Sequence, residues 1–227
     1  MTVLRVVVVL AALCAISAHG QRVRVDEVPM YGGMDRAGVP DLKAGDDKLI
    51  ADTSAHYGSR EKAATEFIQQ GFNFYYKDSL GMAMRRFNQA WLLDPNNPEV
   101  YWGFGVVLRD QENMCESAKH FDKALGFKRY FQGMYPDAAQ TFALCGVSDK
   151  SLSEADRAQL YERADKLYAE AVEKDANKGN VYTSCATANF FREKYADAWA
   201  MVKKARETGG QISPELLRAL RAKMREP

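Results

Sequence analysis

The sequence predicts an all-α protein in which antiparallel helix pairs stack into a solenoid that ends in a C-terminal capping helix. Three observations support this prediction. Apolar and small residues recur with a step of 34 residues. Within each unit they follow the helical spacing of three and four on two successive segments. The run Asp94-Pro95-Asn96-Asn97-Pro98 separates the first unit from the second with residues that end one helix and begin the next.

Composition and charge narrow the class of protein. The chain has 227 residues, 47% of them hydrophobic, which is enough to bury a sizeable core. Its 31 Lys and Arg residues balance 30 Asp and Glu residues. A near-neutral chain lacks the excess of positive charge that phosphate neutralisation requires, so we expect no nucleic-acid partner.

The first segment, residues 1–20, has the features of a secretory signal peptide. Arg5 precedes an apolar run over residues 6–18, and small residues lead to a cleavage site near Gly20. The run is shorter than the roughly 20 residues of a permanent membrane anchor. Lipid attachment at Cys14 is disfavoured because Leu13 stands where a small residue is usual. We therefore expect a periplasmic or secreted protein without an integral membrane span.

Two segments precede the repeats. Residues 21–40, rich in Gly and Pro, are predicted to be an extended leader. Residues 41–58 are predicted to form a short helix that ends at Gly58. Ser59 then follows as a cap for the first repeat helix.

The repeats are predicted at residues 64–97, 98–131, 132–178 and 179–210. A small residue facing an aromatic ring lets two helices approach closely. The third unit carries 13 additional residues, which we expect to form a turn over residues 146–152 and a capping box at Ser153 that starts a long helix to about Lys174. A capping helix is predicted at about 213–224. The positions of the 34-residue step in the first two units are Phe67 and Tyr101, Gly71 and Gly105, Phe74 and Leu108, Ala83 and Ser117, Phe87 and Phe121, and Ala90 and Ala124.

This pattern resembles the tetratricopeptide repeat (TPR) family. The first unit matches best, and later units depart from the family pattern at Arg129 and Ala176, which replace the closing proline, and at Asn189, which replaces a large ring. The resemblance implies a right-handed solenoid of about four units. It also implies that the first helices of the units line a concave groove that binds a peptide or a partner helix.

The residues expected to line that groove lie between the core positions of the first helices. Large aromatic residues with a single arginine are typical anchors of protein interfaces. The carboxylate clamp of some family members is absent, because Ile68 and Phe72 stand where Lys and Asn are expected. An apolar or aromatic peptide is thus favoured over an acidic chain end. The predicted groove residues are Ile68, Phe72, Tyr75, Tyr76, Trp102, Val106, Arg109, Gln140, Thr187, Phe190 and Phe191.

The sequence contains few patterns typical of catalysis or metal binding. Ser59 and Lys62 match a Ser-x-x-Lys pattern of penicillin-binding enzymes, but the partner motifs of that family are absent and a helix cap explains Ser59. His56 and His120 have no metal-ligand spacing. We therefore expect no catalytic residue, no metal, no cofactor and no enzymatic activity.

Three cysteines follow the predicted signal peptide. Cys115 begins the second helix of its unit and Cys145 ends the first helix of the next unit, which puts both at the same rim of adjacent units. An exported protein can form a disulfide there if the two Cα atoms lie within about 7 Å. The alternative is a pair of unrelated buried thiols. Cys185 is expected to be a buried free thiol.

The sequence thus favours a non-enzymatic exported adaptor or scaffold that binds a protein or peptide segment in its groove. A second hypothesis is a structural subunit of a cell-envelope assembly, which would use the outer faces and residues 21–40. A remote third is a periplasmic serine hydrolase that uses Ser59 and Lys62. The identity of the partner and the oligomeric state stay open.

Overall fold

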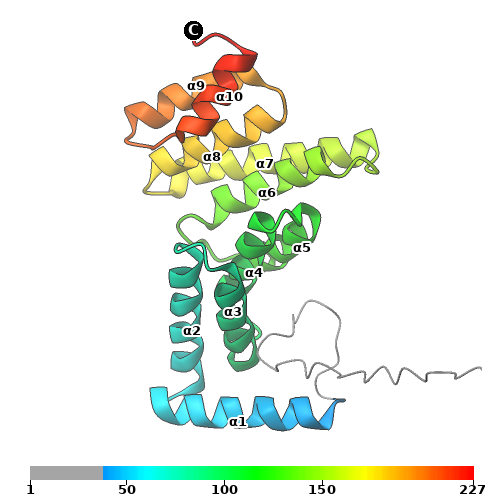
Figure 1. Ribbon diagram of the computed structural model, residues 1–227, viewed down its shortest axis with the longest axis vertical. Coiled ribbons are helices and arrows are strands. Elements are labelled where there is room, and N and C mark those ends of the chain that lie inside the picture. The colour runs from blue at the N-terminus through cyan, green and yellow to red at the C-terminus, as the bar shows by residue number, and fades with distance from the viewer. Residues whose placement is uncertain (1–37) are drawn as a thin grey trace, which may run out of the picture.

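The computed structural model describes residues 38–227, and in this part of the chain all regular structure is helical. Ten helices follow one another along these residues (Figure 1). Their bounds are α1 Pro40–Tyr57, α2 Arg60–Tyr75, α3 Leu80–Leu93, α4 Pro98–Asp110, α5 Met114–Gly126, α6 Met134–Ser148, α7 Glu154–Lys174, α8 Lys178–Phe191, α9 Tyr195–Glu207 and α10 Pro214–Lys223.

The helices are arranged in pairs that follow each other along an elongated stack. In Figure 1 the pairs α2–α3, α4–α5, α6–α7 and α8–α9 succeed one another from the cyan end to the orange end. The first helices also pack on each other, since α2 contacts α4, α4 contacts α6 and α6 contacts α8. Helix α1 packs against α2, and α10 packs against α9. The structure confirms an all-helical fold with contacts between neighbouring helices.

Aromatic rings packed against glycines hold adjacent pairs together. Phe87 of α3 is fully buried, and its ring lies between α2 and α4. A Cβ atom added at Gly71 would lie 2.5 Å from that ring, and one added at Gly103 would lie closer still. Within the second pair, Phe121 of α5 lies against Gly105 of α4 as Phe87 lies against Gly71, at 2.6 Å from an added Cβ atom. Glycine is needed at these positions because the ring occupies the space of a side chain.

Four predicted helix starts are capped by side chains. The hydroxyl oxygen of Ser59 accepts a hydrogen bond from the backbone N–H of Lys62, and the side chain of Asn97 accepts one from Glu99. Ser153 and Ser213 cap α7 and α10 in the same way. Each cap satisfies a backbone donor that has no partner inside its helix.

The third pair has the long second helix that the sequence predicts, but its turn is shorter than predicted. The sequence predicts a turn over residues 146–152, but α6 continues to Ser148 and α7 begins at Glu154. Most of the additional residues therefore lengthen the helices, and α7 reaches 21 residues. Packing between the two helices explains this extension: Gly146 of α6 lies against the ring of Tyr161 of α7.

The predicted disulfide is present. Cys115 at the start of α5 and Cys145 near the end of α6 are bonded, and their Cα atoms are 4.7 Å apart. The bond connects the second helix pair to the third. Cys185 is not in a disulfide, and burial raises the pKa of its thiol to about 11.

A second, smaller apolar cluster closes the C-terminal end. Leu220 of α10 is fully buried and packs with Trp199 and Val202 of α9. The indole N–H of Trp199 donates a hydrogen bond to the carbonyl oxygen of Met224, at 3.1 Å. Helix α10 thereby covers apolar surface that α9 would otherwise expose, as a terminal helix of a stacked array must.

Two predicted segments precede these helices. The signal peptide at residues 1–20 and the leader at 21–40, except its last three residues, lie outside the described residues. Within residues 38–227, none of the helices has the length and apolar character needed to cross a bilayer.

Candidate functional site

The predicted groove residues divide into buried and accessible ones. Ile68 and Val106 are buried in the core, and only 9% of Trp102 is accessible. The expectation that these three side chains face a ligand is wrong. They are covered because α2, α4 and α6 pack directly against each other, which buries the flanks of these helices.

Three aromatic side chains at the C-terminal end of α2 form a cluster that reaches the surface. We call Phe72, Tyr75 and Tyr76 the aromatic patch. The ring of Tyr76 stacks on Phe72 with centroids 6.3 Å apart and lies 5.6 Å from that of Tyr75. Phe72 and Tyr75 are half-buried, whereas 74% of Tyr76 is exposed. The patch presents one large exposed ring on a rigid base.

Trp102 and Phe87 form that base. The ring of Phe72 lies 4.8 Å from Trp102 of α4 and 5.1 Å, edge to face, from Phe87 of α3. Such pairs stabilise beyond their buried area. The sequence predicts Trp102 as a residue of the groove. It is instead part of the packing, so Trp102→Ala would test stability rather than binding.

A polar network, the Arg109 network, connects the patch to two further helices. The guanidinium of Arg109 donates to the carboxylate of Asp137 at 3.0 Å, to Asp110 at 3.2 Å and to the hydroxyl of Tyr75 at 3.1 Å. The indole N–H of Trp102 donates to the second carboxylate oxygen of Asp137, at 2.9 Å. Helices α2, α4 and α6 are thus joined by hydrogen bonds at one point.

The arginine at the centre of the network is mostly shielded from water. Only 11% of the Arg109 side chain is exposed. Burial by itself lowers the pKa of Arg109, but Asp137, Tyr75 and Asp110 together raise it by more, so the guanidinium stays charged. Burial raises the pKa of Tyr75 well above its usual value, and Arg109 opposes this shift while Asp137 and Asp110 add to it. Tyr75 therefore remains a neutral hydrogen-bonding group.

Sequence reasoning missed Asp137. The residue lies in the first turn of α6, where an acidic side chain is ordinarily explained by the helix dipole. Its partners Arg109 and Trp102 are 28 and 35 residues away. One signal in the sequence pointed to Asp137. It lies 34 residues, one repeat, after Gly103, and Gly103 is the neighbour of Trp102 in the chain.

We expect Asp137→Ala to lower the free energy of unfolding by about 2–3 kcal/mol, because it leaves a shielded guanidinium and an indole N–H without their acceptor. The measurement is urea unfolding followed by far-UV circular dichroism. Asp110→Ala is the matched control, since it removes a more exposed carboxylate from the same arginine and should cost less than about 1 kcal/mol. Equal effects of the two substitutions would contradict the assigned role of Asp137.

The remaining predicted groove residues lie farther along the stack. Gln140 is half-buried, and its side-chain oxygen lies 3.2 Å from the hydroxyl of Ser184, which also contacts the hydroxyl of Tyr168 at 3.0 Å. The hydroxyl of Thr187 donates to the backbone of its own helix at 3.1 Å. These polar groups connect α6, α7 and α8 and leave Gln140 fixed in position.

Phe190 and Phe191 form a second aromatic area at the end of α8. Phe190 is half-buried against Tyr195, with ring centroids 5.9 Å apart, whereas 47% of Phe191 is exposed. Helices α4 and α6 stand between α8 and α2 in the order of packing. The predicted residues therefore do not form one continuous aromatic surface, and Tyr76 and Phe191 mark two separate areas.

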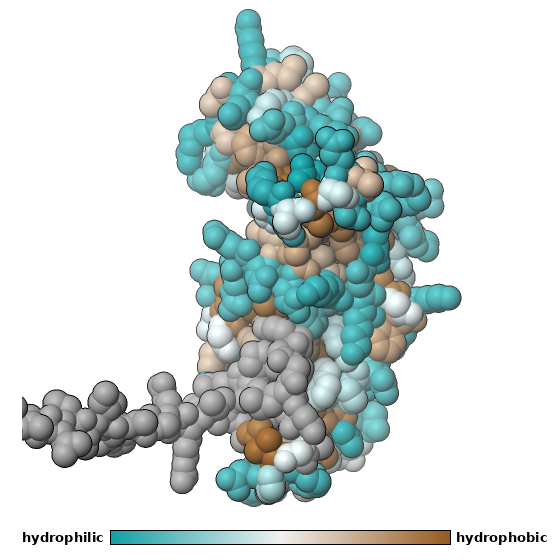
Figure 2. All heavy atoms as spheres, turned by 90° about the vertical axis from the view of Figure 1, so that its right-hand side faces the viewer, coloured by the Kyte–Doolittle hydropathy of each residue, from teal (hydrophilic) through white to brown (hydrophobic). Residues whose placement is uncertain are grey.

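The face shown in Figure 2 is mostly hydrophilic. Apolar residues lie there in small separate areas between polar ones. Scattered apolar residues are normal on a water-exposed surface. Where the described residues are visible on this face, the apolar areas are small.

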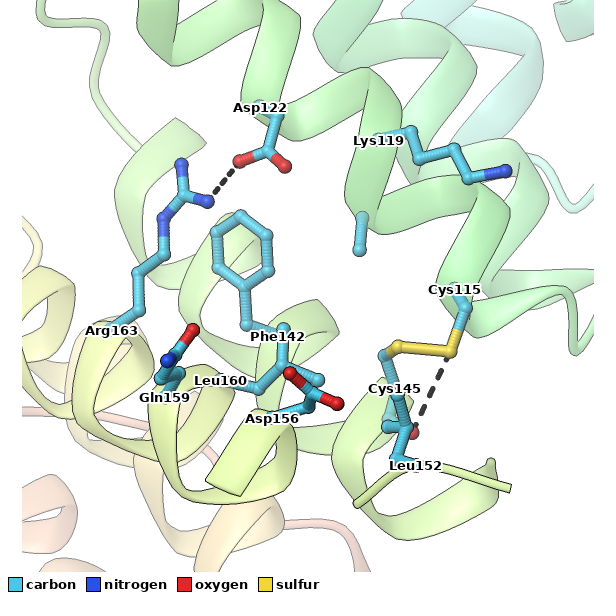
Figure 3. A pocket seen from close by; sticks show the side chains of 11 residues that line it. Cys115, Lys119, Asp122, Phe142, Cys145, Leu152, Asp156, Gln159, Leu160 and Arg163 are labelled. Carbon is cyan, nitrogen blue, oxygen red and sulfur yellow. Dashed lines mark hydrogen bonds and ion pairs between the residues drawn. A yellow bond between two sulfur atoms is a disulfide. The ribbon is translucent and has the colours of Figure 1, made fainter. Parts of the chain in front are cut away.

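A cavity of about 370 Å³ lies between α5, α6 and α7 and was not anticipated (Figure 3). Phe142, Leu160 and the Cys115–Cys145 disulfide form much of its wall, and an ion pair between Arg163 and Asp122 stands at its edge. The guanidinium of Arg163 also lies over the ring of Phe142, 4.2 Å from its centroid. None of the predicted groove residues lines this cavity.

Groups suited to catalysis are few in the described part of the chain. The hydroxyl of Ser59 is engaged in the cap of α2. His120 is buried beside Tyr101 and Phe104, and this burial lowers its pKa to about 4. His56 lies edge-on to the ring of Tyr57. Within residues 38–227, no three His, Cys, Asp or Glu side chains gather in a group that could hold a metal ion.

Comparison of the chain with protein-family models and with curated protein sequences finds no match to either.

Proposed function

We propose that the protein is an exported, non-enzymatic scaffold of the TPR type that binds a protein or peptide segment at the aromatic patch on α2. In this proposal the four helix pairs from α2 to α9 are four TPR units wound in a right-handed solenoid. The 34-residue step and the glycine–phenylalanine contacts within and between pairs support the family assignment.

The observation that carries the binding function is the exposure of Tyr76. A tyrosine ring that is 74% accessible contributes little to the stability of the chain that bears it. Its neighbours Phe72 and Tyr75 are held in place by Trp102 and by Arg109. A rigid aromatic side chain that loses little conformational entropy on binding is a typical anchor of an interface.

Export is supported by two independent features. The apolar run at residues 6–18 has the length of a signal peptide, and the Cys115–Cys145 disulfide is typical of oxidising compartments. We therefore propose a location in the periplasm or outside the cell.

Site-specific photo-crosslinking tests the binding surface. A benzophenone-bearing amino acid is placed at the position of Tyr76 in the full chain, and covalent products are identified by mass spectrometry in cells that export the protein. We expect a defined protein product at this position. The same amino acid at Asp197, which is exposed on α9, is the matched control and should give none.

Crosslinks from Asp197 with none from Tyr76 would contradict the proposal. They would favour a structural subunit that uses the outer helix faces. Circular dichroism of both variants should match that of the unmodified protein, which would exclude unfolding as the cause of a lost product.

A further inference from the structure

The charges around the aromatic patch are unequal in number. Arg109 supplies one positive charge, and Asp110 and Asp137 supply two negative ones. Lys77 and Asp78, both exposed on the turn that follows Tyr76, cancel each other. The patch and its network therefore carry one excess negative charge.

The positive charge is committed to internal partners. Each of the three nitrogens of Arg109 donates to Asp110, Asp137 or Tyr75. Its side chain is only 11% exposed, whereas that of Asp110 is 38% exposed. An acidic group of a partner would meet a neutralised and shielded arginine, but a basic group can reach Asp110 from the solvent.

A series of contacts connects the exposed ring of Tyr76 with the carboxylate of Asp110. Tyr76 packs on Tyr75, whose hydroxyl accepts a hydrogen bond from Arg109, which in turn contacts Asp110. The face of a tyrosine ring also attracts a cation.

We propose that the aromatic patch binds a basic segment, in which a Lys or Arg side chain lies on the ring of Tyr76 and pairs with Asp110. This inference rests on the proposed function and specifies the chemistry of its partner. The aliphatic stem of such a side chain would cover the ring while its charge meets the carboxylate. An acidic chain end is disfavoured, because it would add a negative charge to a region that already has an excess.

Fluorescence anisotropy with three labelled peptides tests the proposal. The peptides share a sequence of alanine and leucine and differ at three positions, which are all lysine, all glutamate or all glutamine. We expect the lysine peptide to bind the full chain at least about tenfold more tightly than the glutamate peptide. Raising the ionic strength should weaken the binding of the lysine peptide, because the attracting charges lie near the surface.

Substitutions separate the contribution of the Asp110 carboxylate to peptide binding from that of the Tyr76 ring. Asp110→Asn keeps the shape of the side chain and should weaken binding of the lysine peptide by about threefold to fivefold, as should Tyr76→Ala. Tyr76→Phe retains the ring face and should bind nearly as the original chain does. Asp197→Asn removes an exposed carboxylate of α9 and should leave the affinity unchanged.

The inference is overturned if the glutamate or glutamine peptide binds as tightly as the lysine peptide, if Asp110→Asn has no effect, or if the lysine peptide fails to bind at millimolar concentration. These outcomes leave the proposed function standing as long as crosslinks form from the position of Tyr76. An absence of those crosslinks would contradict the proposed binding surface itself. Failure of the proposed function is therefore distinguishable from failure of the preference for a basic segment.

Discussion

Phe87→Ala is expected to lower the free energy of unfolding by about 4 kcal/mol, a larger loss than that expected for Asp137→Ala. The ring is fully buried and fills the space between Gly71 of α2 and Gly103 of α4. Removing it leaves a cavity that backbone on both sides cannot readily close. Phe72 would lose a support as well, so Tyr76 should become less well ordered. Urea unfolding monitored by circular dichroism measures the loss.

A double-mutant cycle tests whether the loss of stability in Phe87→Ala arises from the contact between Phe87 and Gly103. Gly103→Ala alone should destabilise by about 1–3 kcal/mol, because its methyl group would collide with the Phe87 ring. In the Phe87→Ala background the same methyl group should partly fill the cavity and recover stability. Gly81→Ala is the control, since nothing lies within 4 Å of its added Cβ atom and helix propensity should stabilise the chain slightly. Additive effects of Phe87→Ala and Gly103→Ala would contradict the packing described.

The second large effect is expected from the disulfide. Replacing both Cys115 and Cys145 by alanine should lower the free energy of unfolding by about 3–4 kcal/mol, because the bond closes a loop whose ends are 30 residues apart. The bond restricts the unfolded chain and, in the folded chain, ties α5 to α6. Helix α6 also carries Asp137, so the same bond secures the partner of Arg109.

Reduction supplies the matched control. A phosphine reductant should lower the stability of the original chain to that of the double variant and leave the double variant unchanged. Unfolding curves with and without reductant, together with a mass-spectrometric count of free thiols, measure this. Three free thiols in the chain purified from an oxidising compartment would refute the bond. An unchanged unfolding midpoint after complete reduction would refute its stabilising role.

Most of the fold could be predicted because its signals are local. Helix starts such as Ser59, Asn97 and Ser153 depend on a side chain and a backbone N–H only two or three residues apart. The pairing of helices followed from small and aromatic residues at helical spacing. The disulfide was one of two alternatives for Cys115 and Cys145, since a stacked array places the ends of their helices at one rim.

The candidate site was predicted less completely. Tyr76 and Phe191 are exposed as expected, but Trp102 and Val106 are buried. Asp137 was missed, although it organises the site through Arg109 and Trp102. The continuation of α6 to Ser148 was also missed, whereas the long helix α7 from the Ser153 cap to Lys174 was predicted. A turn signal at residues 146–152 competed there with packing that arises only when the two helices meet.

The sequence by itself determined which segments are helices, where they begin and which residues face the interior of each pair. The tertiary structure alone decided which of the outward residues stay exposed and which acid meets Arg109. The physical reason is that helical periodicity gives the direction of a side chain relative to its own helix axis. Burial and ion pairing depend in addition on the shift and rotation of one helix against the next, and these are set by all the side chains between them.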